Sequence, residues 1–187
     1  MPHLDVPLST RLPGDVRLRD LTETDAARFA AHVASDLARL SQFLAWPERT
    51  ATAEGALGFI QPYLDQNDGR RVIAGIWADG ELVGGIVLFH HDPVTAVVEL
   101  GCWAVAAAEG TGAVRAACVE GLRLARAWDV ERVQWHCDPR NARSAALARR
   151  LGFVYEGMLR SSYPLRGSRC DTAVYGLVEG EIDEAIR

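Results

Sequence analysis

Residues 95–125 read TAVVELGCWAVAAAEGTGAVRAACVEGLRLA, and this stretch decides which fold we expect. It opens with a β-rich apolar run, which predicts a strand over residues 95–105. From Val114 to Ala125, apolar side chains recur at helical spacing, which predicts a helix with one apolar stripe against a sheet. The loop between them holds two glycines that flank one threonine. A strand, a glycine loop and a helix in this order are typical of sites that bind phosphate through backbone N–H groups.

Two familiar phosphate loops fit this stretch poorly. A Walker loop needs a Gly-Lys pair, and the chain has no lysine, so all 20 of its basic residues are arginine. The same absence excludes lysine Schiff-base chemistry. A dinucleotide-binding GxGxxG loop would need a third glycine where the chain has Arg115, and this unit lies deep in the chain.

The segments on either side predict a mixed sheet with helices on its faces. Asp79 and Gly80 suit a tight hairpin turn between two β-rich runs. Asn141 can cap a short helix that Gly152 closes in a left-handed conformation. We therefore expect an α/β (α+β) chain with a single domain over residues 1–187, in which residues 1–14 form a loosely ordered arm. The expected strands cover 16–21, 71–89 as a hairpin, 95–105, 130–137 and 171–178, and the expected helices cover 22–44, 50–64 with a break or kink at Pro62, 114–125 and 141–153.

Composition narrows the classes of function. The formal net charge is −5, which argues against a nucleic-acid partner, because such binding relies on basic residues, and suits a cationic substrate. The four cysteines are widely spaced without a CxxC pair, so we expect reduced thiols, a cytoplasmic location and no metal site. The N-terminal residues lack the apolar region of a signal peptide, and no run of about 18 apolar residues predicts a membrane span. The sequence leaves a homodimer open.

Five fragments, in order along the chain, resemble the RimJ/RimL-like (ribosomal-protein-alanine acetyltransferase) branch of the GNAT superfamily. This resemblance covers nearly the whole chain. It implies a GNAT fold, with a mixed, mostly antiparallel central sheet and helices on both faces. It also implies direct transfer of an acetyl group from acetyl-CoA to a primary amine, which is a protein or peptide N-terminus or a small amine or antibiotic. The fragments are LRDLTETDA (18–26), LSQFLAWP (40–47), VELGCW (98–103), CDPRNARSAALARRLGFVYEGMLR (137–160) and RGSRCDTAVYGLV (166–178).

In this family, the loop after the central strand holds the CoA pyrophosphate in the pattern Gln/Arg-x-x-Gly-x-Gly/Ala. Here the pattern falls on Glu109, Gly112 and Val114, so only the middle position matches, with Gly110 as an extra match. Losing a charge-assisted contact at Glu109 would cost roughly 1.5–3 kcal/mol. Val114 lies on the apolar stripe of its helix, so we expect its side chain to face the sheet. Arg115 lies in the first turn, where a cation is disfavoured unless an anion is close, either a CoA phosphate or Glu109.

The resemblance further implies that the cofactor lies along the end of the central strand, the glycine loop, the start of the helix that follows the loop and the start of the short helix over 141–153. For two of the implied residues, Asn141 and Ser144, helix capping is an alternative explanation of why they stand at the start of a helix. Capping accounts fully for Asn141 and partly for Ser144. The implied cofactor-binding residues are Trp103, Ala104, Val105, Glu109, Gly110, Thr111, Gly112, Ala113, Val114, Arg115, Asn141 and Ser144.

The transfer needs a base that takes a proton from the amine and a group that stabilises the leaving thiolate. Glu99 is the candidate base. Alternatively, its carboxylate could be the anion that binds the acceptor, or a structural carboxylate that is exposed at an edge or paired with an arginine. Ser144 and Cys137 are candidates near the thiolate, because Ala148 stands where many members place a tyrosine acid; Cys137 could instead be a buried inert thiol. The candidate substrate-binding residues are Trp46, Tyr63, His91 and Glu99, and His90 lies beside His91.

A second class of function stays open on the sequence alone. The chain could be a GNAT-fold protein with weak or no catalysis that senses or binds acyl-CoA. Three departures from the family pattern favour this alternative: Glu109, Val114 and Ala148.

Overall fold

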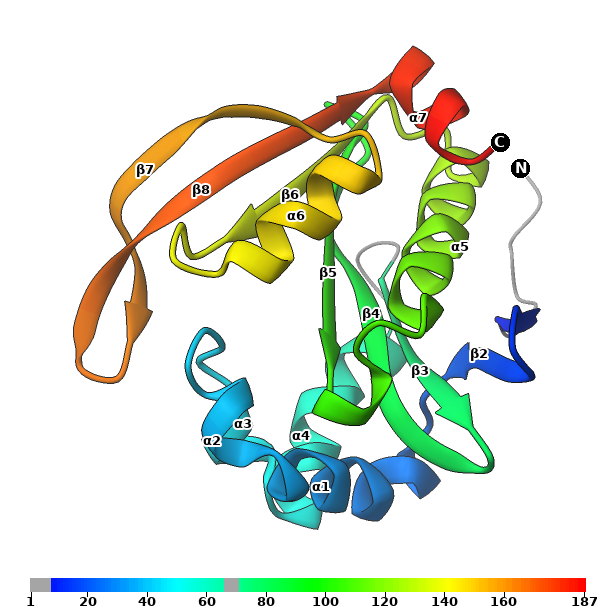
Figure 1. Cartoon of the computed structure of the whole chain (residues 1–187), viewed down its shortest axis with the longest axis vertical. Helices are drawn as coiled ribbons and strands as arrows, with labels where there is room; N and C mark the ends of the chain where they lie inside the picture. The colour runs from blue at the N-terminus through cyan, green and yellow to red at the C-terminus, as the bar shows by residue number, and fades with distance from the viewer. Residues whose placement is uncertain (1–7, 66–70) are drawn as a thin grey trace.

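The computed structural model describes residues 8–65 and 71–187, whose eight strands form one sheet (Figure 1). The strand order is β1-β2-β3-β4-β5-β6-β8-β7, and every neighbouring pair is antiparallel except β5 and β6. The expected mixed, mostly antiparallel sheet is therefore confirmed. The strands are β1 Ser9–Leu12, β2 Val16–Asp20, β3 Val72–Ala78, β4 Glu81–Asp92, β5 Val97–Ala104, β6 Arg132–Cys137, β7 Val154–Leu165 and β8 Ser168–Val178. The helices are η1 Glu23–Asp25, α1 Ala26–Ser35, α2 Leu37–Leu40, α3 Pro47–Thr50, α4 Ala53–Leu64, η2 Ala106–Ala108, α5 Ala113–Ala127, α6 Ala142–Arg150 and α7 Glu179–Ala185.

Helices cover both faces of the sheet, because its strands bury apolar side chains on both sides. One core packs against α5, α6 and α7 and includes Leu100, Leu122 and Ile182. The other core packs against α1 and α4 and includes Phe29 and Ile60. Among residues 8–65 and 71–187, no helix combines the length and the apolar character that crossing a bilayer would require.

The strands β5 and β6 lie side by side for only a short distance. Their paired residues run from Val97 and Arg132 to Glu99 and Gln134. Beyond that point the two strands continue without pairing, and they fan apart in Figure 1. The backbone groups of β5 that face this opening in the sheet have no partner among the described strands, so they are available to hydrogen bond with another molecule.

The N-terminal arm is shorter than the sequence predicts. Residues Ser9–Leu12 form β1 and pair with β2, and the Leu12 side chain is buried. The expectation of loose order is therefore wrong for this segment, because its apolar side chain joins the core under the sheet. The rest of the expected arm, residues 1–7, lies outside the described residues.

The long helix expected over 22–44 is divided at Asp36. This residue has φ −137°, and its carboxylate accepts a hydrogen bond of 3.0 Å from the backbone N–H of Ala106. Side-chain hydrogen bonds of this kind compete with the helical pattern. In contrast, α4 continues past Pro62 and ends at Leu64, two residues later, so the expected break does not occur at the proline itself.

The two hairpins differ in how far they project. Asp79 and Gly80 have φ values of 51° and 81°, which confirms the expected tight turn between β3 and β4. The β7–β8 hairpin extends well beyond the rest of the sheet (Figure 1). Near its tip, the Tyr163 hydroxyl accepts a hydrogen bond of 3.2 Å from the backbone N–H of Ala45. The hairpin therefore closes against the segment between α2 and α3.

Candidate active site

The glycine loop ends directly at the start of α5. Gly110 and Gly112 have φ values of 74° and 82°, a left-handed conformation that favours glycine. A Cβ atom on either residue would meet nothing within 4 Å, so glycine is required here by the backbone rather than by space. The Thr111 hydroxyl donates to the Ala108 carbonyl at 2.9 Å and accepts from the Ala113 N–H at 3.2 Å. The loop is therefore held by its own hydrogen bonds.

The first turn of α5 leaves donors for a ligand. The N–H groups of Val114 and Arg115 have no carbonyl partner within the helix, because they lie in its first turn. The Val114 side chain packs against the core under α5, as the sequence predicts. The Arg115 side chain is exposed, and no ion pair joins it to another of the described residues. The loop thus presents backbone donors and the guanidinium group of Arg115.

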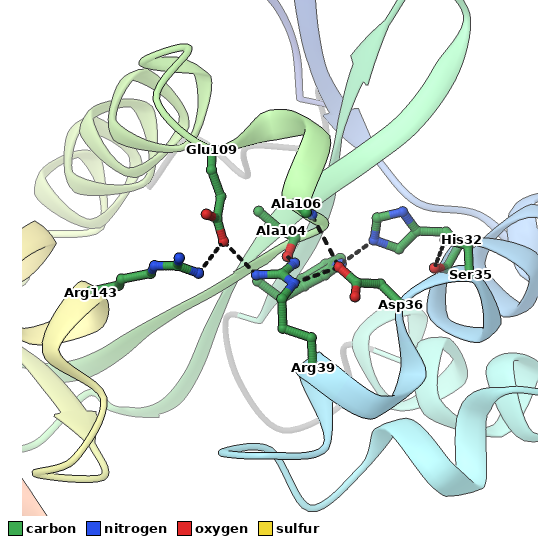
Figure 2. Close-up of polar contacts among 9 residues, drawn as sticks. His32, Ser35, Asp36, Arg39, Ala104, Ala106, Glu109 and Arg143 are labelled. Carbon is green, nitrogen blue, oxygen red and sulfur yellow. Dashed lines mark hydrogen bonds and ion pairs between the residues drawn. The ribbon is translucent and has the colours of Figure 1, made fainter.

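Glu109 is bound by two arginines from other parts of the chain (Figure 2). Its Oε1 atom lies 2.6 Å from Nη1 of Arg39 and 2.7 Å from Nη1 of Arg143. These arginines come from α2 and from the start of α6, on either side of the loop. The predicted alternative, in which Arg115 pairs with Glu109, is therefore not the arrangement that the structure shows.

Arg39 connects this carboxylate to the end of β5. Its Nε donates to the Asp36 carboxylate at 2.5 Å, and its Nη2 donates to the backbone carbonyl of Ala104. The same Asp36 oxygen also accepts from the Ala106 backbone, as noted above. The charges of Asp36, Arg39, Glu109 and Arg143 alternate along this chain of contacts and sum to zero.

The start of α6 brings three of the predicted residues together. Asn141 caps the helix, since its Oδ1 accepts from the Ser144 N–H at 3.1 Å. The Ser144 hydroxyl oxygen accepts from Nε1 of Trp135 at 3.0 Å. It also hydrogen bonds with the buried Cys137 thiol, whose pKa is raised chiefly by burial. Ser144 and Cys137 therefore face each other at the edge of β6 that borders the opening.

On the opposite face of the sheet, Glu99 lies between two imidazoles. Its Oε2 atom is 3.1 Å from Nδ1 of His136 and 3.4 Å from Nδ1 of His90. The Glu99 side chain is only 14% exposed, against 27% for His136 and 76% for His90. Nδ1 of His136 donates a hydrogen bond to Glu99, and this bond raises the pKa of His136 against the opposing effect of burial. Glu99 is therefore paired with histidine rather than with arginine.

His136 is not singled out by any local pattern in the sequence. Glu99 pairs with Gln134 across the parallel strands, and strand alternation puts His136 on the same face, two residues further along. The alternation of Arg132, Gln134 and His136 with buried apolar neighbours was the available signal. It could not be used without knowing that β6 lies beside β5 in this register.

The two adjacent histidines at the end of β4 point to different places. His90 has φ 53°, at an irregularity in the pairing of β4 with β5, and its ring reaches Glu99. The His91 ring instead packs against Trp128, at the end of α5, with 5.8 Å between ring centroids. Of these two candidates for the acceptor site, His90 lies beside Glu99, whereas the irregular pairing places the His91 ring against α5; a role of His91 in substrate binding stays a prediction.

Aromatic side chains form a wall beside Glu99. Trp46 stacks on Phe59, with 4.9 Å between ring centroids, and both pack on the core under α1 and α4. Burial raises the pKa of Tyr63 to about 12, and the negative charge of Glu99 adds to that increase. Trp46, Tyr63 and Glu99, three of the predicted substrate-binding residues, thus lie in one region.

The side chain of Trp103 has a structural role. It is buried, and its Nε1 donates to Nε2 of His32 at 3.2 Å. Nδ1 of His32 lies 2.8 Å from the Leu82 carbonyl, and burial lowers the pKa of His32. Only the backbone of Trp103 remains for a ligand between β5 and β6. The described residues also contain no group of three or more His, Cys, Asp or Glu side chains that could hold a metal ion.

Comparison with known proteins identifies similar chains. The family model described as "Acetyltransferase (GNAT) domain" matches residues 15–154. The Bacillus subtilis (strain 168) protein named "Putative ribosomal N-acetyltransferase YdaF" is 30% identical over 172 residues, which cover 89% of this chain and 92% of that protein. A crystal structure of a protein described as "Probable acetyltransferase" has a TM-score of 0.85 at 28% identity, covering 92% of this chain and 98% of the other. RimL, a ribosomal alpha-N-protein acetyltransferase solved with coenzyme A in a disulfide to one of its cysteines, has a TM-score of 0.81 at 24% identity, covering 92% of this chain and 97% of its own.

Proposed function

Because the chain belongs to the GNAT acetyltransferase family, we propose that it transfers an acetyl group from acetyl-CoA to a primary amine. The single observation that carries this proposal is the separation of β5 from β6 beside Glu99. The separation provides an open strand edge for one substrate and a carboxylate for the other. The proposal extends to a cytoplasmic location, with neither a membrane nor a nucleic acid as partner, and it leaves the homodimer as an open expectation.

The residues around the opening fit acetyl-CoA. An unpaired edge of β5 can hydrogen bond the amide groups of an extended pantetheine arm, and the donors at the start of α5 suit its pyrophosphate. RimL was solved with coenzyme A bound, which supports this assignment. Its disulfide between the coenzyme and a cysteine also supports placing Cys137, with Ser144, near the CoA sulfur. These two groups would then stabilise the leaving thiolate.

Glu109 weakens the loop's attraction for phosphate without reversing it. Its carboxylate is neutralised by Arg39 and Arg143, so it does not stand alone against an incoming anion. The same pairing occupies two guanidinium groups that could otherwise contact phosphate. The backbone donors of α5 and the exposed Arg115 side chain are left as the main attractive groups.

The acceptor amine would bind on the face that carries Glu99. A partly buried carboxylate beside imidazoles attracts an ammonium group and can help to remove its proton. The aromatic wall of Trp46 and Tyr63 bounds this face. The names of the relatives favour the α-amine of a protein N-terminus over a small amine or antibiotic.

A second candidate function is an acyl-CoA sensor or binding module without significant turnover. The observation that favours it is the engagement of Glu109 by both arginines beside the phosphate loop. In this alternative the chain binds acyl-CoA and does not transfer the acyl group.

Mass spectrometry with acetyl-CoA and a panel of acceptors tests the proposal. The panel includes peptides with different N-terminal residues, small amines and aminoglycosides. We expect one class to gain an acetyl group with the wild-type chain, and the Glu99→Gln variant to transfer it at least about 10-fold more slowly. The Glu120→Gln variant, which removes a carboxylate paired with Arg123 on α5, is the matched control. Binding of acetyl-CoA without acetylation of any acceptor would favour the sensor.

A further inference from the structure

We infer that His136, rather than Glu99, is the base that takes the proton from the acceptor amine, and that Glu99 is the positioning residue that orients it. The inference rests on the proposed transferase function and assigns the roles within its acceptor site. It starts from the geometry of the two side chains, which lie 3.1 Å apart on neighbouring strands.

The contact determines which nitrogen of the imidazole can act. Glu99 meets Nδ1 of His136, so the proton of the neutral ring is held on that nitrogen. Nε2 then carries the free lone pair, and it makes no hydrogen bond within residues 8–65 and 71–187. A carboxylate that fixes one imidazole nitrogen while the other works as a base is the arrangement of a carboxylate–histidine pair. Glu99, which is 14% exposed, has the less accessible of the two positions.

The other charged groups around His136 are few. Glu99 approaches from β5 and raises the pKa of His136, while Arg132 on β6 lowers it. His90 reaches the same Glu99 oxygen from β4, and Tyr63 on α4 is near enough for Glu99 to raise its pKa. On the β8 side, His136 pairs with Val174, which carries no charge. The negative charge of Glu99 therefore dominates the electrostatics at His136.

The proton balance follows from this assignment. The acceptor enters as an ammonium ion, and Nε2 of His136 accepts one of its protons. The nitrogen lone pair then forms the bond to the thioester carbon, and the carbon–sulfur bond breaks with its electron pair on sulfur. The attacking nitrogen then loses a second proton, which the leaving thiolate takes up to form the CoA thiol. The proton on His136 is released to solvent.

The pH dependence of kcat/KM distinguishes the two bases. In the wild-type chain, activity should rise with pH as His136 loses its proton, with a midpoint above the ordinary value of about 6.5. His136→Gln should lower kcat by about 100-fold or more and remove this limb of the profile. Glu99→Gln should cost less and move the midpoint to lower pH, because the raising interaction is gone. The inference would be overturned if Glu99→Gln lowered kcat more than His136→Gln did, and if kcat/KM of His136→Gln still rose with pH as in the wild-type chain.

Two further measurements keep the test independent of fold and of the acceptor. Calorimetry with acetyl-CoA should give the same affinity for His136→Gln and wild type, which shows that the variant is folded. Added imidazole should restore part of the turnover of His136→Ala. Nitrogen NMR of the wild-type imidazoles should find the neutral His136 ring protonated on Nδ1. If the proton is found on Nε2 instead, the inference is wrong, whether or not an acceptor is known. If the proton is on Nδ1 but the chain acetylates no acceptor, the result counts against the proposed function and not against the inferred tautomer.

Discussion

Glu99 and Glu109 are both carboxylates held between two basic side chains, and the two sites differ in the kind of base. Glu99 lies between His136 and His90, and imidazole is a side chain that can gain or lose a proton near neutral pH. Glu109 lies between Arg39 and Arg143, which remain charged at every physiological pH. The first arrangement can exchange protons, and the second can only hold charge in place.

This difference matches the two tasks of the proposed acetyl transfer, in which Glu99 serves the acceptor and Glu109 lies beside the cofactor. The acceptor side must remove a proton, so a titratable partner is useful there. The cofactor side must hold an anion whose charge does not change, so arginine is the suitable cation. The comparison predicts that pH acts on the Glu99 site, and that salt and charge substitutions act on the Glu109 site.

The largest effect on stability is expected for Arg39. Arg39→Ala removes hydrogen bonds to Asp36, Glu109 and the Ala104 carbonyl, so the free energy of unfolding should fall by about 2 kcal/mol. Urea denaturation measures this change. Arg143→Ala is the control, because its side chain is 74% exposed and should cost less than about 0.5 kcal/mol. Equal losses in the two variants would show that Arg39 does not anchor the cluster.

The next effect concerns acetyl-CoA affinity. Glu109→Gln leaves Arg39 and Arg143 without their shared anion, so a phosphate should bind about 10-fold more tightly, which corresponds to about 1.4 kcal/mol. Calorimetry at low and high salt measures the affinity and its salt dependence, which should become steeper. Weaker binding would mean that Glu109 positions the two arginines for the cofactor instead of competing for them.

A smaller effect concerns the pH dependence of stability. The pKa of His136 is higher in the folded chain than in the unfolded chain. The pairing of His136 with Glu99 therefore stabilises the fold fully when the pH is below the unfolded pKa, and this stabilisation is lost as the pH rises through the folded pKa. Glu99→Gln should therefore lower the free energy of unfolding by about 1 kcal/mol more at pH 6 than at pH 9. Denaturation at the two pH values tests this, with Glu109→Gln as a comparison that should show no such difference. A loss that is the same at both values would contradict the pairing.

The smallest effects are expected for Arg115. Its side chain is exposed and has no ion pair with the described residues, so Arg115→Ala should change the free energy of unfolding by less than about 0.5 kcal/mol. It should weaken acetyl-CoA binding by about 3-fold, through the loss of a screened charge beside the phosphate. Thermal denaturation and calorimetry provide the two measurements. A large loss of stability would reveal a structural partner for Arg115.

Local features of the sequence predicted most of the fold. The Asp79-Gly80 turn, the Asn141 cap and the inward position of Val114 each depend on neighbouring residues, and each is confirmed. Side-chain contacts across the chain were not predictable in the same way. Glu109 meets Arg39 and Arg143 at separations of 70 and 34 residues, and no local pattern connects them.

The candidate site shows the same division. Glu99 could be selected from the sequence because a charge inside an apolar strand needs a reason. His136 could not be selected, since its place beside Glu99 depends on the parallel register of β5 and β6. The sequence also does not show which of His90 and His91 faces Glu99, because an irregularity at the end of β4 decides it.

The most direct test of the account is a calorimetric titration of the wild-type chain with acetyl-CoA. The separated β5 and β6 strands and the donors at the start of α5 predict a dissociation constant in the micromolar range, on the order of −8 kcal/mol. The absence of binding heat at millimolar acetyl-CoA would contradict the central claim that this opening is an acetyl-CoA site.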